Sequence, residues 1–279
     1  GAKLEGTDEV VYVSSGEGAT SEGEFFEALN WAARERLPVL FVIQNNGYAI
    51  SVPQASQTAS EIHRIARGFG MPTFDVDGTW FEPMYQMLPP VIARIREGGG
   101  PALVEGRVIR MDSHSSSDDQ RKYRSEEELA DLTRQDPIYQ TEQYLLRHKV
   151  LQKEELSAIR AEIKAGVDRA ADEADQAPAP SEQEFLAHIY SGPVMTIPDP
   201  PAPHYLGEEP VTMIDAINHG LREEMKRNPK IVMWGEDIAD PKGGVFGVTR
   251  GLTETFPAQV QNSPLAEASI VGVAGGMAI

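Results

Sequence analysis

The chain has 279 residues, which is enough for two domains that each bury a sizeable core. Its formal net charge of −18 argues against a nucleic-acid-binding surface, and no apolar run approaches the roughly 18 to 20 residues that a membrane span needs. The absence of cysteine excludes disulfides, thiolate metal sites and a cysteine nucleophile, and it is compatible with a reducing compartment. We expect a cytoplasmic protein without a nucleic-acid or membrane partner.

Strand and helix patterns alternate over residues 9–110. The apolar, β-branched run 9–15 is typical of a buried parallel strand, and the run 38–44 predicts a second one. The elements expected beyond these are a helix over 60–70, a strand over 72–78, a helix over 81–97 and a strand over 101–109. This repeated alternation predicts an α/β fold with a doubly wound parallel sheet.

The segment between the first two strands has the pattern of an amphipathic helix. Ser21 and Glu24 have the spacing of a capping box, which predicts that the helix begins there. Apolar residues then recur at helical spacing and predict one buried face. The residues expected on this face are Phe25, Phe26, Leu29, Ala32 and Ala33.

The remainder of the chain has four parts. A polar loop over 111–124 is followed by helical patterns that end near residue 174. Residues 176–210 are rich in proline and indicate a linker, after which a second α/β unit begins. The expected domains are therefore 1–175 and 211–279. Because the last of these stops inside an apolar helical pattern, we interpret the chain as part of a longer protein.

Two polar motifs follow the first two strands. Gly16, Glu17 and Gly18 come after the first strand, and Asn45 and Asn46 end the second. If the strands are parallel neighbours, these motifs share the sheet edge where open α/β folds bind ligands. Carboxylate and amide oxygens suit magnesium, which in turn binds phosphates. The alternative is a tight glycine turn with a solvated glutamate.

The motif also carries a family resemblance. "GEGATSEGEFFEALNWAARERLPVLFVIQNNGYAIS" resembles the thiamine-diphosphate signature, and residues 4–190 resemble the α subunit of the decarboxylating component of branched-chain 2-oxo acid dehydrogenase complexes. The resemblance implies that Glu17 and Asn46 bind magnesium through their side chains and Tyr48 through its carbonyl. It also implies cofactor contacts by Gly16, Gly18, Ala19 and Asn46. Pyruvate-type relatives usually have aspartate at the position of Glu17, which points towards branched-chain substrates.

The loop "RMDSHSSSDDQRKYRS" resembles the active-site loop of the same α subunits. His114 then corresponds to the family's active-site histidine, and Ser115 to a regulatory serine, where a phosphate would add about two negative charges. The matching loop-ordering positions are Arg110, Asp118, Tyr123 and Arg124. Mitochondrial branched-chain relatives have a second histidine where this chain has Ser113. Without the resemblance, His114 is an ordinary solvated loop residue.

Residues 211–279 resemble the start of the β subunit of these complexes, most clearly in "GEDIA", "GGVFGVT" and "SPLAE". The resemblance implies that Glu267 hydrogen-bonds the aminopyrimidine ring of the cofactor and is catalytic, together with His114. Glu236 is expected near the same ring. The alternative for Glu267 is an exposed glutamate that favours the dipole at a helix start.

The resemblance as a whole implies a 2-oxoisovalerate dehydrogenase type of oxidoreductase, with α-like and β-like halves fused in one chain. Thiamine diphosphate and magnesium are the implied cofactors, and a lipoyl-bearing acyltransferase is the implied partner. Relatives also imply a homo-oligomer, a dimer of fused chains. A pyruvate or acetoin dehydrogenase of the same family is the close alternative. A non-catalytic phosphate-binding module is the distant one, although the chain lacks the Gly-x-x-x-x-Gly-Lys-Ser/Thr run typical of nucleotide hydrolysis.

Overall fold

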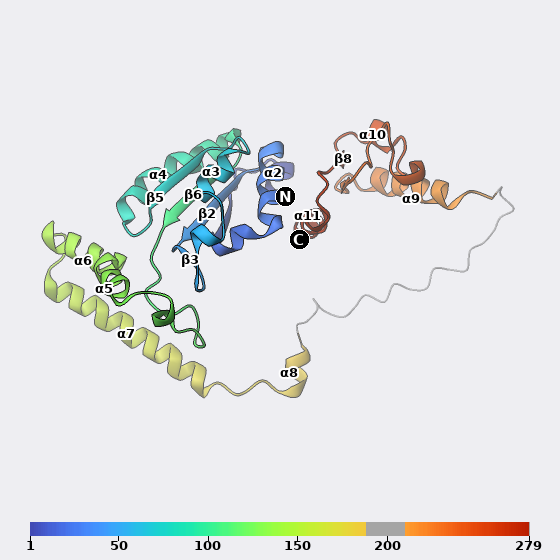
Figure 1. The fold of residues 1–279 in the computed structure, drawn as a ribbon. Helices are drawn as coiled ribbons and strands as arrows, with labels where there is room; N and C mark the ends of the chain where they lie inside the picture. Colours follow the sequence, from blue (N-terminus) through green and yellow to red (C-terminus); the bar gives the residue numbers. More distant parts are fainter. Residues whose placement is uncertain (188–209, 279) are drawn as a thin grey trace. The chain divides into compact units, whose positions relative to one another are not determined.

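A computed structural model describes residues 1–187 and 210–278, and Figure 1 shows the arrangement of their helices and strands. Most of the expected proline-rich linker, residues 188–209, lies outside the described residues. The chain divides into two compact units, of which the first combines Gly1–Tyr144 with Met213–Ile279 and the second is Leu145–Thr212. The domain boundaries expected from the sequence stay a prediction.

The first unit contains a four-stranded parallel sheet. Its strand order is β1 (Val11–Gly16), β2 (Val39–Asn45), β6 (Ala102–Arg107) and β5 (Thr73–Asp77). All neighbouring pairs are parallel, and Val11 to Gly16 of β1 pair in register with Val39 to Gln44 of β2. The alternation of strands and helices in the sequence therefore predicted an α/β fold with a parallel sheet correctly.

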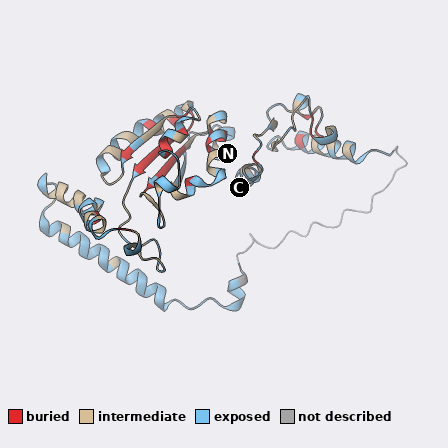
Figure 2. Ribbon diagram, in the orientation of Figure 1, coloured by how far each residue is buried: buried red, intermediate tan, exposed pale blue. Residues whose placement is uncertain are grey.

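Helices cover both faces of this sheet. α2 (Gly23–Glu35) and α3 (Ile62–Arg67) pack on one face, whereas α4 (Phe81–Arg94) packs on the other. Alternation along β2 makes this possible, because Phe41 and Ile43 face α2 and α3 while Leu40 and Val42 face α4. Figure 2 shows the resulting concentration of buried residues along the strands of the sheet.

Short elements complete the first half of the unit. They are α1 (Ala2–Glu5), the 3-10 helix η1 (Gly18–Ser21), the antiparallel pair β3 (Tyr48–Ala49) and β4 (Val52–Pro53), η2 (Gln54–Ser56), the π-helical turn η3 (Ile95–Gly99), η4 (Gln120–Lys122), α5 (Glu126–Gln135) and α6 (Pro137–Arg147). The loop expected over 111–124 contains only η4. The second unit contains α7 (Lys153–Gln176) and α8 (Glu182–Leu186).

The segment from Met213 forms a smaller α/β arrangement with its own core. Met225, Leu252 and Val260 are its buried centre. Its elements are α9 (Met213–Arg227), β7 (Met233–Gly235), η5 (Val245–Gly247), α10 (Leu252–Thr255), β8 (Val260–Asn262) and α11 (Glu267–Ala278), with β7 and β8 paired in parallel. This agrees with the expectation that an α/β pattern resumes after the proline-rich stretch.

Two local predictions were wrong. The first strand is not buried: it is an edge strand among the described residues, and Val11, Tyr12 and Val13 are 46%, 60% and 38% exposed. The capping box also does not form. Residues 18–21 form η1 instead, so α2 begins after Glu22, and the Ser21 hydroxyl donates to Gln57 Oε1 rather than capping the helix.

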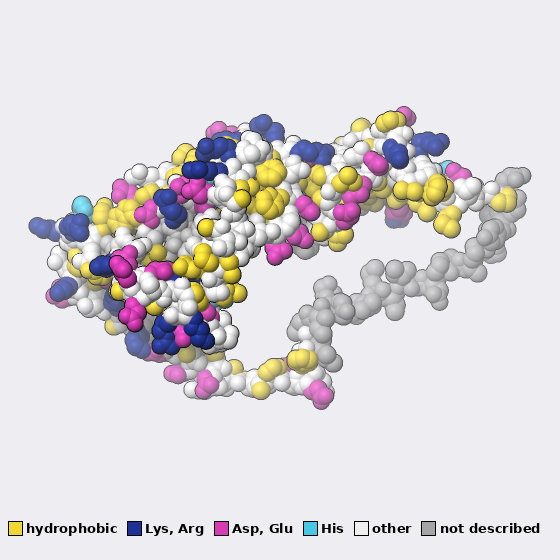
Figure 3. Space-filling model, in the orientation of Figure 1, with side chains coloured by type: hydrophobic (Ala, Val, Ile, Leu, Met, Phe, Trp, Pro, Cys, Tyr) yellow, Lys and Arg dark blue, Asp and Glu magenta, His cyan; other side chains and the backbone are white. Residues whose placement is uncertain are grey.

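Charged side chains of both signs lie on the surface of the protein. On the face drawn in Figure 3, Lys and Arg side chains lie among Asp and Glu side chains. Within the described ranges, no helix combines the length and the apolar character that crossing a membrane requires.

Candidate functional site

The polar motifs after β1 and β2 meet at one edge of the sheet. Glu17 follows β1 directly, and Asn46 follows β2 directly. Because the two strands are parallel neighbours in register, their ends bring these residues together: the Asn46 backbone N–H donates to Glu17 Oε2 at 3.1 Å. The turn after Glu17 is fixed locally, since the Thr20 hydroxyl donates to the Glu17 carbonyl oxygen at 2.6 Å. This geometry places the Glu17 carboxylate beside the backbone amide of Asn46.

Both side chains are suited to bind a cation. Glu17 is 1% exposed, and a buried carboxylate is costly unless donors or a cation neutralise it. Asn46 Oδ1 is also buried and has no hydrogen-bond partner among the described residues, which is uncommon for a buried amide oxygen. A hard cation would satisfy both oxygens. The donor set therefore fits magnesium.

Tyr48, the third expected magnesium ligand, begins β3 two residues after Asn46. It lies in the same turn as Asn46, and its carbonyl as a ligand stays a prediction. In the described parts of the chain, no three His, Cys, Asp or Glu side chains gather as a metal cluster. The expected set contains only one such residue, because its other members are an amide and a backbone carbonyl.

The glycines on either side of Glu17 differ in their surroundings. A Cβ added to Gly18 would lie 2.7 Å from Ala49 Cβ, so the close approach of η1 to β3 requires glycine there. A Cβ added to Gly16 would meet no described atom within 4 Å. Ala19 is exposed in η1. Gly16 and Ala19 thus border open space beside the carboxylate, which fits the approach of a phosphate-bearing ligand.

The loop over 111–124 is organised around the carboxylate of Asp118. Its Oδ2 accepts the Tyr123 hydroxyl at 2.6 Å and the His114 backbone N–H at 2.8 Å. Arg110 Nη2 donates to the same Tyr123 hydroxyl at 2.6 Å. Tyr123 therefore connects Arg110 to Asp118, and these are three of the four loop-ordering positions that the resemblance implied.

Arg124 connects this loop to the turn that carries Asn46 and Tyr48. Its side chain is buried, and Nη1 donates to the Arg110 carbonyl oxygen at 2.8 Å and to Gln120 Oε1 at 2.9 Å. The guanidinium lies 4.7 Å from the centre of the Tyr48 ring, within the range of a cation–π contact. The Tyr48 hydroxyl in turn contacts Glu128 Oε2 at 3.3 Å. Arg124 therefore contacts both the loop and the turn.

Hydrogen bonds and burial shift two pKa values at the centre of the loop. The Tyr123 hydroxyl, and next the His114 N–H, lower the pKa of Asp118 below its ordinary 3.8. Burial, and next donation to Asp118, raises the pKa of Tyr123. Because the folded-state pKa of Asp118 is the lower one, its contribution to loop order is present above pH 3.8 and is lost as the pH falls through the folded value.

We predict that Asp118→Asn loosens the loop. The substitution replaces an acceptor of two donors with a group that cannot accept both strongly, so amide hydrogen exchange over residues 111–120 should become severalfold faster near neutral pH. Asp119→Asn is the matched control, because Asp119 pairs mainly with the exposed side chain of Arg121. Equal exchange in wild-type protein and the Asp118 variant would show that this carboxylate does not order the loop.

The expected functional side chains of the loop lie at its surface. His114 is exposed, and Ser115 is exposed with its hydroxyl 3.1 Å from Ser117 Oγ. Arg110 differs from them, since its Nε and Nη1 are buried and find no hydrogen-bond partner in residues 1–187 and 210–278. These two donors leave the guanidinium with capacity to hold an anionic group.

Glu267 is the first residue of α11 and is exposed. Glu236 lies in the turn after β7, half-buried, with its Oε1 unpartnered within the described chain. α11 packs on α2, where Ser269 Oγ donates to Glu27 Oε2 at 2.6 Å. Within the described residues, no hydrogen bond or ion pair joins Glu267 or Glu236 to Glu17 or Asn46, so their common role stays a prediction.

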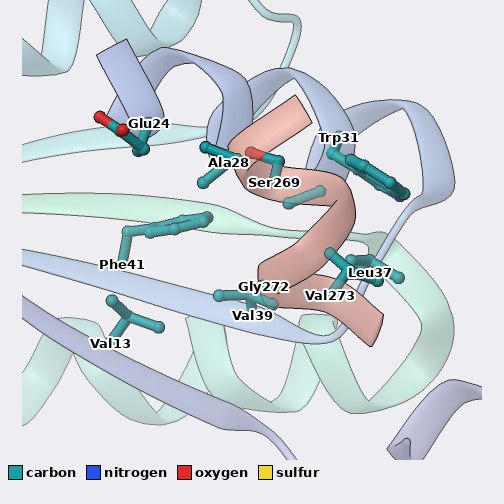
Figure 4. A pocket seen from close by; sticks show the side chains of 12 residues that line it. Val13, Glu24, Ala28, Trp31, Leu37, Val39, Phe41, Ser269, Gly272 and Val273 are labelled. Atoms are coloured by element: carbon teal, nitrogen blue, oxygen red, sulfur yellow. The ribbon is translucent and has the colours of Figure 1, made fainter. Parts of the chain in front are cut away.

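A separate apolar pocket of about 400 Å³ lies between α2, the sheet and α11 (Figure 4). Trp31, Leu37 and Phe41 line it from one side, and Gly272 and Val273 from the other. It contains none of the expected site residues. The site at the strand ends is thus a polar edge and not this apolar cavity.

Sequence reasoning missed one part of the site region. Glu105 in β6 is 2% exposed and bonds to Asn45, the residue before Asn46. The available signal was a single carboxylate in the otherwise apolar run "PALVEG". Its partners could be known only from the register of β2 and β6.

Open parallel α/β sheets bind ligands at the carboxyl ends of their strands. At this edge the sheet of the first unit has a buried carboxylate, an amide oxygen without a partner among the described residues, and exposed glycine backbone. These features are typical of cofactor-binding α/β proteins. Residues 1–183 match the family described as dehydrogenase E1 component, and the chain belongs to this family. The matched part is an α-type domain of its thiamine-diphosphate-dependent class. Residues 209–279 match a second family, the transketolase pyrimidine binding domain.

Curated relatives resemble the first part of the chain. The α subunit of 2-oxoisovalerate dehydrogenase from Bacillus subtilis is 38% identical over 190 residues, covering 68% of this chain and 58% of that protein. The α subunit of acetoin:2,6-dichlorophenolindophenol oxidoreductase from Cupriavidus necator is 40% identical, covering 68% and 57%. The pyruvate dehydrogenase E1 component α subunit of Rickettsia typhi is 32% identical, covering 67% and 58%. The chain thus spans somewhat over half the length of these relatives.

Proposed function

We propose that the full-length protein is the decarboxylating component of a 2-oxo acid dehydrogenase complex. It would oxidatively decarboxylate a branched-chain 2-oxo acid such as 2-oxoisovalerate and transfer the acyl group to a lipoyl group of a partner acyltransferase. The observation that carries this proposal is the contact of buried Glu17 with the Asn46 backbone N–H at adjacent strand ends, next to an Asn46 Oδ1 that has no partner among the described residues, in a member of the E1 family.

The residues of this chain would divide the work of binding. Glu17, Asn46 and the Tyr48 carbonyl would hold magnesium, while Gly16 and Ala19 leave room for the diphosphate. Thiamine diphosphate, when bound, supplies the electron sink for decarboxylation. The protein supplies position and proton transfers: Glu267 would exchange a proton with the pyrimidine ring nitrogen opposite the amine, and Glu236 would support it nearby.

The loop would serve the same site at its mouth. Asp118 accepts the backbone N–H of His114 and is itself held by the Tyr123 hydroxyl, which would place the His114 imidazole near the diphosphate and the incoming lipoyl group. A phosphate on Ser115 would add negative charge beside an anionic cofactor and oppose binding. Arg110 is a cation of the same loop, and its Nε and Nη1 have no partner among the described residues.

The two family matches on one chain support a fusion of an α-like and a β-like half. In such a fusion, the proline-rich stretch would tether the two halves, and each half would be present at a higher effective concentration near the other. We propose a cytoplasmic dimer of such chains with domains 1–175 and 211–279, in which Glu17 and Glu267 act on one cofactor.

Substrate class is the finer part of the proposal. The Glu17 variant of the signature and the "HSSSDD" run favour branched-chain acids. Since an apolar pocket gains roughly 1 to 3 kcal/mol per well-packed methylene, 2-oxoisovalerate should exceed pyruvate by tenfold or more in kcat/KM. The measurement uses an artificial electron acceptor with both acids and acetoin. A preference for pyruvate or acetoin, whose dehydrogenases include the relatives at 32% and 40% identity, would overturn the branched-chain proposal.

A further inference from the structure

A buried carboxylate lies directly behind the turn that carries Asn46. Glu105 is in the middle of β6, pairs with Ile43 of β2, and is 2% exposed. Its Oε1 accepts Asn45 Nδ2 at 2.6 Å, and its Oε2 accepts the backbone N–H of His63 at 2.8 Å. His63 Nδ1 lies 2.7 Å from the same Oε2. The carboxylate therefore faces donors on both of its oxygens.

Asn45 Nδ2 and the His63 backbone N–H are both donors, and a carboxylate can accept from both without donating to either. These hydrogen bonds offset the cost of burying the carboxylate. The His63 ring nitrogen adds a third contact, whose donor is set by the ring tautomer. An amide in place of the carboxylate would present a donor to either Asn45 or His63.

The contact with Glu105 fixes which way the Asn45 amide points. Asn45 Nδ2 donates both to Glu105 Oε1 and to Gln54 Oε1, the latter at 2.8 Å. Asn45 Oδ1 is consequently turned toward the Gly47 backbone N–H, which it accepts at 2.9 Å. The Gln54 N–H donates to the Gly47 carbonyl, and Gly47 has a φ of +82°, so this is the tight turn that presents Asn46 and Tyr48.

We propose that Glu105 is a positioning residue for this turn. Its charge orients the Asn45 amide, the amide holds the Gly47 N–H, and the turn thereby presents Asn46 Oδ1 and the Tyr48 carbonyl toward Glu17. The inference rests on the proposed magnesium and thiamine diphosphate site. Partners outside the ligand set commonly determine metal affinity in this way, with losses of about 10- to 100-fold on their removal.

The test uses Glu105→Gln in the full-length protein with two readouts. In the cofactor-free protein, amide hydrogen exchange at Gly47 should rise at least tenfold, because its acceptor is no longer held. The magnesium concentration that half-saturates thiamine diphosphate binding, measured by calorimetry, should rise by about tenfold or more. His63→Asn is the control, since the introduced amide nitrogen can replace Nδ1 in its contact with Glu105 Oε2, and both readouts should stay near the wild-type values.

A double variant that exchanges the amide and the carboxylate between positions 45 and 105 separates the loss of side-chain orientation at position 45 from general damage to the core. In the double variant Asn45→Asp with Glu105→Gln, the introduced glutamine donates to the introduced aspartate, whose second oxygen still accepts the Gly47 N–H. The Gln54 amide, which accepts from Asn45 in the wild-type protein, turns so that its Nε2 donates to the aspartate. This variant should recover at least part of the lost protection and of the lost magnesium affinity. If Glu105→Gln does not fold, Asn45→Ala removes the same link and should produce the same tenfold loss in both readouts.

Unchanged exchange at Gly47 in Glu105→Gln would overturn the inference. So would faster exchange with unchanged magnesium dependence, or a double variant no better than the single one. Failure of the proposed function gives a different result, because wild-type protein would then show no magnesium-dependent binding of thiamine diphosphate, while the exchange readout would still report on the turn.

Discussion

Glu267→Gln in the full-length protein is expected to slow deuterium exchange at the thiazolium carbon of thiamine diphosphate by roughly a hundredfold or more. Glu267 would exchange a proton with the pyrimidine ring nitrogen opposite the amine, and loss of the thiazolium proton would depend on that exchange. Glutamate can exchange a proton, whereas glutamine of the same size can hydrogen-bond but cannot carry the proton.

Cofactor affinity should stay nearly normal in this variant, which separates proton transfer from binding. Quenched-flow exchange read by NMR measures the rate, and calorimetry measures the affinity. Glu126→Gln is the matched control, because Glu126 is likewise an exposed first residue of a helix, α5. Fast exchange in the Glu267 variant would leave Glu267 with only the dipole role of a helix-start glutamate.

Glu17→Ala and Asn46→Ala are each expected to weaken magnesium-dependent binding of thiamine diphosphate by more than tenfold, which corresponds to over about 1.4 kcal/mol. Each removes one of the two side-chain oxygens proposed to bind the ion, and the alanine leaves nothing to coordinate it. The Glu17 change also leaves the Asn46 N–H without its acceptor. Calorimetric titration of the full-length variants measures the loss.

Glu22→Ala is the control for this pair. Glu22 is exposed, lies five residues after Glu17, and its side chain makes no capping hydrogen bond to α2. Its affinity should match that of the wild-type protein. Wild-type affinity in both Glu17→Ala and Asn46→Ala would show that the strand-end residues do not bind the metal.

Periodicity in the sequence was sufficient to predict the α/β architecture. Alternating apolar runs predicted β2 and β6 and the helices between them, because a strand buried on both faces needs apolar side chains along its whole length. The same rule failed for β1, whose residues Val11 to Val13 have that composition although the described sheet ends there. The composition of a strand indicates how much apolar surface it can bury. It does not indicate whether another strand or helix covers that surface.

The site could be predicted only where its residues are close in the sequence or follow neighbouring strands. Glu17 and Asn46 were paired correctly in space because parallel strand ends share one edge. The contact of Arg124 with the Tyr48 ring depends on the path of a long loop. The sequence of such a loop has no hydrophobic periodicity from which its path could be predicted. The bonding of Glu105 to Asn45 depends on register across two strands.

Titration of the full-length wild-type protein with thiamine diphosphate, with and without magnesium, tests the central claim most directly. We predict saturable binding that requires magnesium, and a melting temperature that rises with thiamine diphosphate and magnesium but not with ATP and magnesium. Binding that is independent of magnesium, or a rise in melting temperature with ATP alone, would contradict the assignment of the strand-end site.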